Sequence, residues 1–167
     1  HHRHRHHHRR CCPPPPLAAP ACTTIYFDGT TDVDAVAADN INAAGEGFTL
    51  SAWVLRAKAA GIANLWERII DFGNGAEQDN IYLAFDADGT YPLYYGVFHG
   101  TEWQGAATMQ IGATFPQKSW TAVQLTHAPS GDVVIYLDGV VAATGNLPPP
   151  EPAARSGLYI GRSHKNH

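Results

Sequence analysis

The feature that most constrains the fold of this chain is a series of short apolar alternations, separated by turn residues, that begins after Thr23. In the clearest of them, Phe48, Leu50, Ala52 and Val54 fall on one face of an extended segment. Alternation with a period of two is the pattern of a strand that is buried on one side. Further segments of this kind are 25–27, 69–72, 81–85, 93–98, 123–125, 133–137, 140–141 and 158–160.

These segments follow one another at intervals of roughly 8–12 residues, which is the spacing typical of a β-sandwich. Asp138-Gly139 lies between two apolar runs and predicts a tight hairpin, because a type I′ turn needs positive φ at both central positions. Only 16% of the residues are charged, and the chain contains 16 Gly and 12 Pro. We therefore predict an all-β fold, an antiparallel β-sandwich.

The chain divides into an N-terminal arm, residues 1–22, and a body, residues 23–167. A length of 167 residues suits one domain with a substantial core. The arm is rich in His and Arg up to Arg10 and then contains Pro13–Pro16, a run that favours either a stiff polyproline II spacer or an unstructured linker. No apolar run approaches the roughly 18 residues of a membrane span, and we expect neither a membrane span nor a nucleic-acid partner.

The charge of the arm is opposite to that of the body. Arg3, Arg5, Arg9 and Arg10 carry the arm's positive charge, and they leave seven Lys and Arg against fifteen acids in the rest of the chain, a formal charge of −8. A cationic segment tied to an acidic body predicts contact with an anionic partner. That partner is either a polyanion or the acidic body of another copy.

Three cysteines, Cys11, Cys12 and Cys22, precede the strands of the body, so no disulfide between them can cross-link those strands. A bridge from Cys22 to one of the adjacent pair leaves one thiol over. In an oxidising compartment that odd thiol favours an interchain bond, and in a reducing compartment it carries no such meaning. Together with Leu17, these cysteines form the part of the arm that we expect to take part in assembly.

Several motifs, taken in order, resemble the laminin-G-like and concanavalin-A-like domains. They are Phe27-Asp28-Gly29, Phe48-Thr49-Leu50-Ser51-Ala52-Trp53-Val54, Trp120-Thr121-Ala122-Val123-Gln124-Leu125-Thr126, Val134-Ile135-Tyr136-Leu137-Asp138-Gly139 and Leu158-Tyr159-Ile160-Gly161-Arg162-Ser163. The resemblance spans about residues 23–163 and implies a secreted or extracellular jelly-roll domain.

The sequence departs from the family's pattern after Ser163. Members of the family usually continue into another strand, which lies beside the first one and completes the sheet. Here the given sequence ends at His167. Either further residues supply that strand, or the sheet keeps an open edge that pairs with a segment of another copy, for which Leu17–Thr24 is the best candidate.

The family includes glycoside hydrolases, which need two carboxylates placed on either side of the scissile bond. In this fold the pair appears as Glu-x-Asp-x-x-Glu or a close variant, and no glutamate of this chain has such a partner. The five glutamates are Glu46, Glu67, Glu77, Glu102 and Glu151. We therefore expect a protein that is not an enzyme.

Some relatives hold Ca²⁺ at the rim of the sandwich, where acids and amides in loops supply hard oxygen ligands. The candidates for such a site are Asp71, Asp79, Asn80, Asp86 and Asp88. No run among them matches a Ca²⁺ loop, and turn formation explains Asp86-Ala87-Asp88-Gly89 at least as well. The His tract of the arm could hold Zn²⁺, Cu²⁺ or Ni²⁺, but its arginines oppose a cation, so Ca²⁺ is the one cofactor that we carry forward.

Aromatic side chains bear on carbohydrate binding, since rings stack on sugars. Trp103 lies in a polar, Gly-flanked segment beside Glu102 and Gln104, and we take these three residues as the candidate ligand site. The resemblance places Trp53 and Trp120 in the core of the sandwich or at its edge.

The proline tracts are candidates for hydroxylation and O-glycosylation, as in some extracellular matrices. They comprise Pro13, Pro14, Pro15, Pro16, Pro148, Pro149 and Pro150. Two functions stay open. One is a structural subunit that polymerises with other copies of itself through its arm and open sheet edge, as in a fibre or matrix. The other is a lectin-like module of a larger secreted protein, which binds extracellular glycans or proteins.

Overall fold

The computed structural model describes residues 24–27, 46–56, 67–85, 93–103 and 115–164. Every regular element in these ranges is a strand, which confirms the predicted all-β class. The strands are β1 Phe48–Leu55, β2 Glu67–Gly73, β3 Ile81–Phe85, β4 Leu93–His99, β5 Glu102–Trp103, β6 Trp120–His127, β7 Asp132–Leu137, β8 Val140–Asn146 and β9 Gly157–Ile160.

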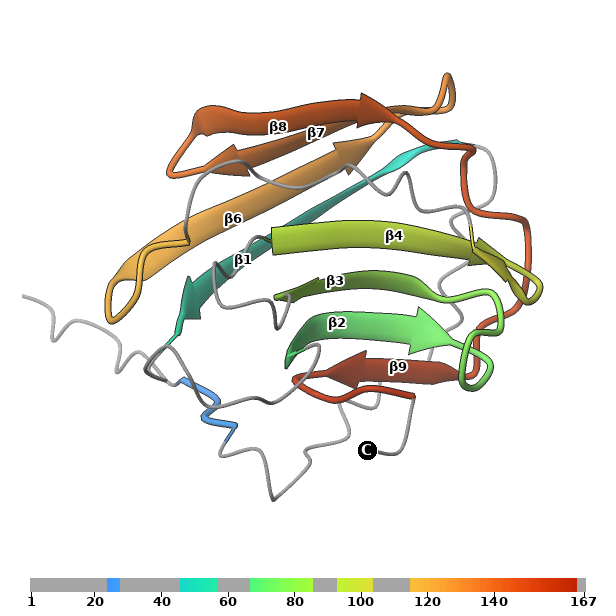
Figure 1. Cartoon of the computed structure of the whole chain (residues 1–167), viewed down its shortest axis with the longest axis horizontal. Coiled ribbons are helices and arrows are strands. Elements are labelled where there is room, and N and C mark those ends of the chain that lie inside the picture. Colours follow the sequence, from blue (N-terminus) through green and yellow to red (C-terminus); the bar gives the residue numbers. More distant parts are fainter. Residues whose placement is uncertain (1–23, 28–45, 57–66, 86–92, 104–114, 165–167) are drawn as a thin grey trace, which may run out of the picture.

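The strands form two antiparallel sheets that pack face to face (Figure 1). One sheet has four strands in the order β1-β6-β7-β8, and the other has five in the order β5-β4-β3-β2-β9. The chain crosses from the first sheet to the second between β1 and β2, returns before β6, and crosses again after β8. The arm, residues 1–22, lies outside the described residues, so its extended form stays a prediction.

The core consists of the inward-facing side chains of both sheets. Val123, Leu125 and Ile135 from the four-stranded sheet are buried, and so are Leu83 and Tyr95 from the five-stranded sheet. In β6 and β7 these positions alternate with half-buried or exposed ones, as the period of two requires. The core is therefore built from the same alternation that is visible in the sequence.

The predicted hairpin at Asp138-Gly139 is confirmed. Both residues have positive φ, 50° and 79°, and the turn joins Leu137 of β7 to Val140 of β8. The Asp138 side chain also accepts a hydrogen bond from the backbone N–H of Ala122, at 2.9 Å, and so ties the turn to β6. This contact fixes the register of three strands at one end of the sheet.

The predicted strand at 25–27 is wrong, because residues 24–27 form no ladder with any described strand. Ile25 and Tyr26 are exposed, whereas the ring of Phe27 occupies the space where a Cβ on Gly161 would lie. Gly161 has a φ of 72°, so this position needs glycine for its backbone as well as for the ring. One docked ring thus replaces the expected strand pairing.

Substitutions on the inner and the outer face of the four-stranded sheet should differ in their effect on the free energy of unfolding. Ile135→Ala removes a side chain with 0% exposure and should lower the free energy of unfolding by about 2–5 kcal/mol. Val141→Ala, on β8 of the same sheet but 54% exposed, should change it by less than about 0.5 kcal/mol. Urea denaturation measures both, and equal effects would contradict the assigned faces.

Candidate functional site

The outer face of the four-stranded sheet carries two large exposed rings. On β1 the inward positions are Phe48, Leu50, Ala52 and Val54, so Trp53 must point outward, and it is 69% exposed. Strand pairing places it opposite Ala122 on β6 and places Leu55 opposite Trp120, which is 48% exposed. Because diagonal neighbours on one face of a sheet are about 7–8 Å apart, the two indoles lie within reach of one ligand.

Neutral polar side chains continue this face beside the two rings. One cross-strand row runs Ser51, Gln124, Tyr136 and Val141, and a second row runs Thr49, Thr126, Val134 and Thr144. The acids described on this sheet, Asp132 and Asp138, lie only at its two ends. The rows between them hold hydroxyl, amide, aromatic and aliphatic groups without charge. We call this surface the outer face.

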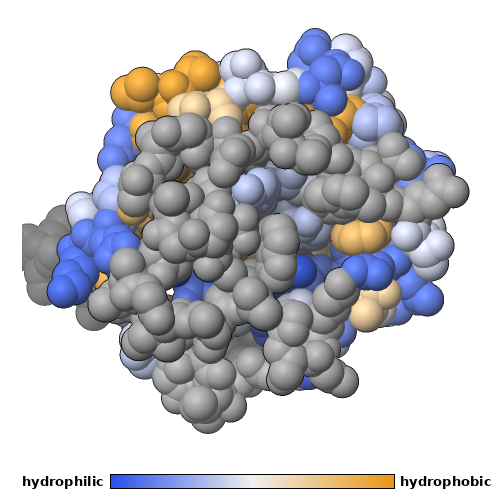
Figure 2. Space-filling model, viewed as in Figure 1, coloured by the Kyte–Doolittle hydropathy of each residue, from blue (hydrophilic) through white to orange (hydrophobic). Residues whose placement is uncertain are grey.

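The apolar character of this region extends to the hairpin between β7 and β8. Val140 and Val141 are both exposed, and Figure 2 shows hydrophobic atoms gathered over this hairpin at the upper left of the view. Two exposed valines at the tip of a hairpin are ordinary surface residues. Val140 serves below as a control for the aromatic positions.

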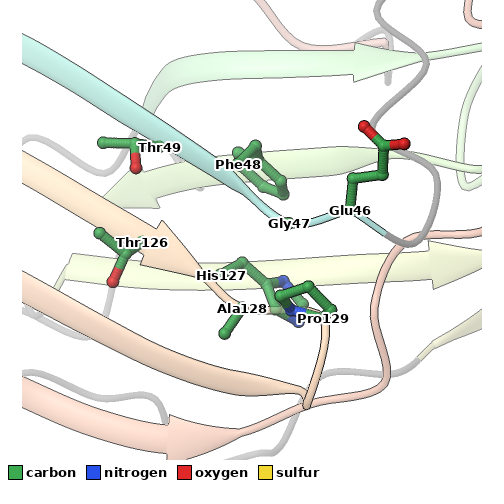
Figure 3. Close-up of a pocket in the computed structure, with 8 residues that line it drawn as sticks. All are labelled: Glu46, Gly47, Phe48, Thr49, Thr126, His127, Ala128 and Pro129. Atoms are coloured by element: carbon green, nitrogen blue, oxygen red, sulfur yellow. The ribbon is translucent and has the colours of Figure 1, made fainter.

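A shallow, open hollow of about 320 Å³ lies at the other end of β1 and β6 (Figure 3). Phe48 from β1 and His127 from β6 are paired across the strands, with ring centroids 5.8 Å apart. Glu46, Thr49, Thr126 and Pro129 are among the other residues that line the hollow. Figure 3 shows the Glu46 carboxylate pointing away from the imidazole of His127.

Both nitrogens of the buried His127 ring are engaged. Nε2 lies 3.1 Å from the carbonyl oxygen of Leu147 and must donate to it, since a carbonyl only accepts. Nδ1 therefore accepts from the hydroxyl of Tyr95, at 2.8 Å, on the opposite sheet. Burial lowers the pKa of His127 and raises the pKa of the Tyr95 hydroxyl, so both groups stay neutral. The pair is a polar link between the two sheets and is not a free acid or base.

Three of the five residues predicted to bind Ca²⁺ lie in the described part of the chain. Asp71 is buried; its Oδ1 accepts from Asn80 Nδ2 at 2.7 Å, and its Oδ2 accepts from Arg68 Nε and from the backbone N–H of His164, both at 3.1 Å. The guanidinium of Arg68 in turn lies 4.4 Å from the ring centre of Tyr82. The carboxylate of Asp71 is thus surrounded by N–H donors and offers a poor site for a cation.

The third residue, Asp79, shapes the loop between β2 and β3. Its Oδ1 accepts from the N–H of Gly100 at 2.8 Å, and its carbonyl accepts from Nε of the buried Arg155 at 2.7 Å. Burial lowers the pKa of Arg155, and the charge of Asp79 opposes that change. Asp86 and Asp88 lie outside the described residues, so Ca²⁺ binding at this rim stays a prediction.

Across the described ranges, no group of three or more His, Cys, Asp and Glu side chains is arranged to hold a metal ion. In the same ranges, no helix has the length and apolar character that a membrane crossing requires.

The predicted ligand site at Glu102, Trp103 and Gln104 is placed only in part. Glu102 and Trp103 form β5 and pair with His99 and Phe98 at the end of β4, whereas Gln104 lies outside the described residues. The structure therefore does not test this site. Its backbone belongs to the edge of the five-stranded sheet.

Trp53 and Trp120 were the more informative rings. The resemblance left the core and the edge open for them, and the structure places neither in the core: Trp53 lies on the border strand β1, and Trp120 begins β6, the next strand of the sheet. The sequence already held the signal for Trp53. If Phe48, Leu50, Ala52 and Val54 share the buried face, Trp53 belongs to the other one.

The remaining predicted positions lie far from the outer face or outside the described residues. Cys11, Cys12, Leu17, Cys22 and Pro13–Pro16 belong to the part of the arm that is not described. Of the second proline tract, Pro148 is exposed and Pro150 is buried, and the carbonyl of Pro149 accepts a hydrogen bond from His99 Nε2 at 2.9 Å. Pro148 is thus the most accessible of the three.

Residues 24–167 match the family described as the concanavalin A-like lectin/glucanases superfamily, and the chain belongs to that superfamily. Among solved structures it is similar to domain 4 of AbnA, a GH43 extracellular arabinanase from Geobacillus stearothermophilus in complex with arabinotriose. The TM-score is 0.51 at 16% identity, over 75% of this chain and 56% of that chain, so the match spans little more than half of that structure. The galectin LEC-6 of Caenorhabditis elegans gives a TM-score of 0.45 at 17% identity, over 81% of this chain and 88% of that chain. No curated protein matches the sequence.

The buried imidazole of His127 should make folding stability depend on pH. Because burial lowers its pKa below 6.5 in the folded chain, the unfolded chain binds the proton more readily, and the free energy of unfolding falls as the pH drops through about 6.5. His127→Gln should reduce the difference between urea midpoints at about pH 7.5 and about pH 5.5. His164→Gln keeps the buried ring and should preserve that difference; if both variants behave alike, the assignment to His127 is wrong.

Proposed function

We propose that this chain is a non-catalytic, carbohydrate-binding module of an extracellular protein and that it binds neutral glycans on the outer face of its four-stranded sheet. The observation that carries the proposal is the pair of exposed indoles, Trp53 and Trp120, on adjacent strands beside rows of uncharged side chains. Folded proteins rarely leave such large rings in water unless they contact a partner.

The chemistry of this face suits a sugar. The C–H side of a pyranose or furanose ring stacks on an indole, while its hydroxyls exchange hydrogen bonds with neutral donors and acceptors. Gln124 on β6 and Ser51 on β1 offer such groups in the row next to Trp53. Without charge along the central rows, the face favours neutral chains over acidic ones. The arabinanase domain of the same fold is described in complex with arabinotriose, which supports an oligosaccharide as the ligand class.

Two polar groups of the sandwich, Glu67 and His127, support a role without catalysis. Glu67 is held by Arg56 in an ion pair of 2.8 Å, and both nitrogens of His127 are occupied. Neither group is available to transfer a proton to a glycosidic oxygen. Secretion, and O-glycosylation of the proline tracts, belong to the same proposal, because the resemblance to laminin-G-like domains implies an extracellular location.

Truncation of the stacking rings should weaken glycan binding. Trp53→Ala and Trp120→Ala should each raise the dissociation constant for a neutral polysaccharide about tenfold or more, the effect of removing an aromatic anchor worth roughly 1.4 kcal/mol or more. Val140→Ala on the nearby hairpin should leave it unchanged. A glycan array identifies the ligand, and titration calorimetry measures the constants.

The same titration separates the outer face from the site predicted at the β4–β5 hairpin. If Trp103→Ala abolishes binding and the two outer-face variants do not, the ligand lies at Glu102 and Trp103. An array without any bound glycan would remove the carbohydrate proposal for both sites.

Self-assembly through the arm is a second candidate function, and one observation favours it. Within the described part of the chain, β1 has a neighbouring strand only on the side of β6, so its other side is open to a strand from another copy. In this proposal Leu17–Thr24 of one copy pairs with β1 of the next, a heterologous contact that builds a filament if it does not close into a ring. Cys11, Cys12 and Cys22 would then reinforce the contact between copies.

Arm-driven assembly should depend on the apolar part of the arm. Leu17→Asp in the full chain should convert high-mass species into smaller ones, because a charge makes a poor partner at a ladder position. Size-exclusion chromatography and negative-stain microscopy measure the change. Filaments that persist in this variant and under reducing conditions would exclude the arm as the inserting strand.

A further inference from the structure

The side chain of Asn74 joins two segments that are far apart in the sequence. Asn74 begins the β2–β3 loop, residues 74–80, which lies beside the β8–β9 connection, residues 147–156, at the right of the view in Figure 1. Its Nδ2 donates to the carbonyl of Ala154 at 2.7 Å, and its Oδ1 accepts from the backbone N–H of Ser156 at 3.0 Å. One exposed amide therefore ties the loop to the connection.

The two ends of this amide cannot be exchanged for other polar groups. On the Oδ1 side, Ser156 also places its hydroxyl 3.3 Å away. On the Nδ2 side both neighbours are oxygens, the carbonyl of Ala154 and Oδ2 of Asp79, which lies 3.4 Å from Nδ2. A carbonyl and a carboxylate only accept hydrogen bonds, so the side chain at this position must present a donor to them.

The residue after Asn74 is a glycine that the backbone requires. Gly75 has a φ of 149°, a conformation that other residues rarely adopt. Its N–H makes no hydrogen bond to any residue that the structure describes. The loop thus places a backbone nitrogen that is neither bonded nor shielded by a side chain directly after an exposed asparagine.

We propose that Asn74 is a site of spontaneous deamidation and that the product releases the β8–β9 connection from the β2–β3 loop. The nitrogen of Gly75 attacks Cγ of Asn74, and a C–N bond forms. The Cγ–Nδ2 bond breaks, and Nδ2 leaves as ammonia with the proton of the Gly75 N–H. Water then opens the cyclic imide to aspartate or to isoaspartate, so the reaction needs only the chain and water. This inference goes beyond glycan binding and does not require it.

The product removes the donor that the tie needs. One oxygen of the new carboxylate can still accept from Ser156, but the other replaces Nδ2 and faces the carbonyl of Ala154 and the carboxylate of Asp79 without a proton between them. Like-charged and lone-pair groups at such distances repel each other. The tie at Asn74 therefore opens when its amide is lost.

The charged groups around the tie do not compensate for this repulsion. They are Glu77 and Asp79 on the loop, Glu151 and Arg155 on the connection, and His99 and Glu102 in the neighbouring β4–β5 hairpin. Acids outnumber cations in this set. The Nε of Arg155 is bonded to the carbonyl of Asp79 at 2.7 Å and forms a second tie between the two segments. Because deamidation leaves this second tie in place, the chain stays folded at lower stability.

The chemistry selects Asn74 among the asparagines of the chain. Asn74-Gly75 is the only Asn-Gly pair in the sequence. Asn146 is also exposed, but Leu147 follows it, and Asn80 is buried and precedes Ile81. A branched side chain after the asparagine shields the attacking nitrogen and slows ring closure. Asn146 is therefore the matched internal control.

Peptide mapping by mass spectrometry tests the modification. The full chain, incubated folded at mildly alkaline pH, should accumulate aspartate and isoaspartate at position 74 while Asn146 keeps its amide. The chain unfolded in urea should react faster at Asn74, because the folded amide must first leave Ala154. If the folded chain forms no product at Asn74, or forms as much at Asn146, the modification site is wrong.

The variant Asn74→Asp tests the release, since it is the aspartate product in pure form. It should unfold at a lower urea concentration than wild type at neutral pH, and hydrogen exchange in the β8–β9 connection should be faster. The difference from wild type should shrink as the pH falls through about 4, where an aspartic acid takes up a proton and again presents a donor to Ala154. His127 is present in both chains, so its titration cancels in the comparison.

Gln78→Glu is the control for this variant, because it makes the same amide-to-carboxylate change in the same exposed loop. The side chain of Gln78 has no hydrogen bond to the described residues, so its urea midpoint and hydrogen exchange should stay close to those of wild type. Equal effects of Gln78→Glu and Asn74→Asp would assign the loss to charge alone and overturn the release. Either failure leaves glycan binding on the outer face untouched.

Discussion

The structure depends on one constraint, the burial of alternate side chains between two sheets. Once Val123, Leu125 and Ile135 are committed to the core, the residues between them must face solvent, because a pleated strand offers no third direction. The outer face is thus a geometric consequence of the core. Its uncharged side chains and its two indoles occupy the outward positions that alternate with the core positions.

A buried polar link adds specificity to this apolar core. His127 on one sheet accepts a hydrogen bond from Tyr95 on the other and donates to the carbonyl of Leu147 after β8. The polar atoms of the His127 and Tyr95 side chains each have a partner, so the link holds one alignment of the two sheets. At the opposite end, Asp138 ties the β7–β8 turn to Ala122 of β6. These two contacts fix the four-stranded sheet that carries both the outer face and the open border of β1.

The exposed tryptophans of the candidate site were not predicted as ligand contacts from the sequence. The sequence favours Trp103 as a ligand contact because its segment is polar and flanked by glycines. The family motifs place Trp53 and Trp120 in the core of the sandwich or at the edge of the sandwich. The parity of β1 already placed Trp53 opposite the core. The parity of Val123 and Leu125 gives the same signal for Trp120, but only pairing across β1 and β6 sets it opposite Leu55 and beside Trp53. Carboxylates that looked available for Ca²⁺, such as Asp71, are surrounded by N–H donors from distant segments.

The sequence by itself determined the all-β class, most strand positions and the Asp138-Gly139 turn, because period-two alternation and positive-φ turns are local properties of the chain. It could not determine that residues 25–27 would dock a single ring against Gly161 instead of forming a strand. Nor could it show which strands would stand at the borders of the two sheets. Those features arise from contacts between segments far apart in the chain, and only the tertiary structure decides which segments meet.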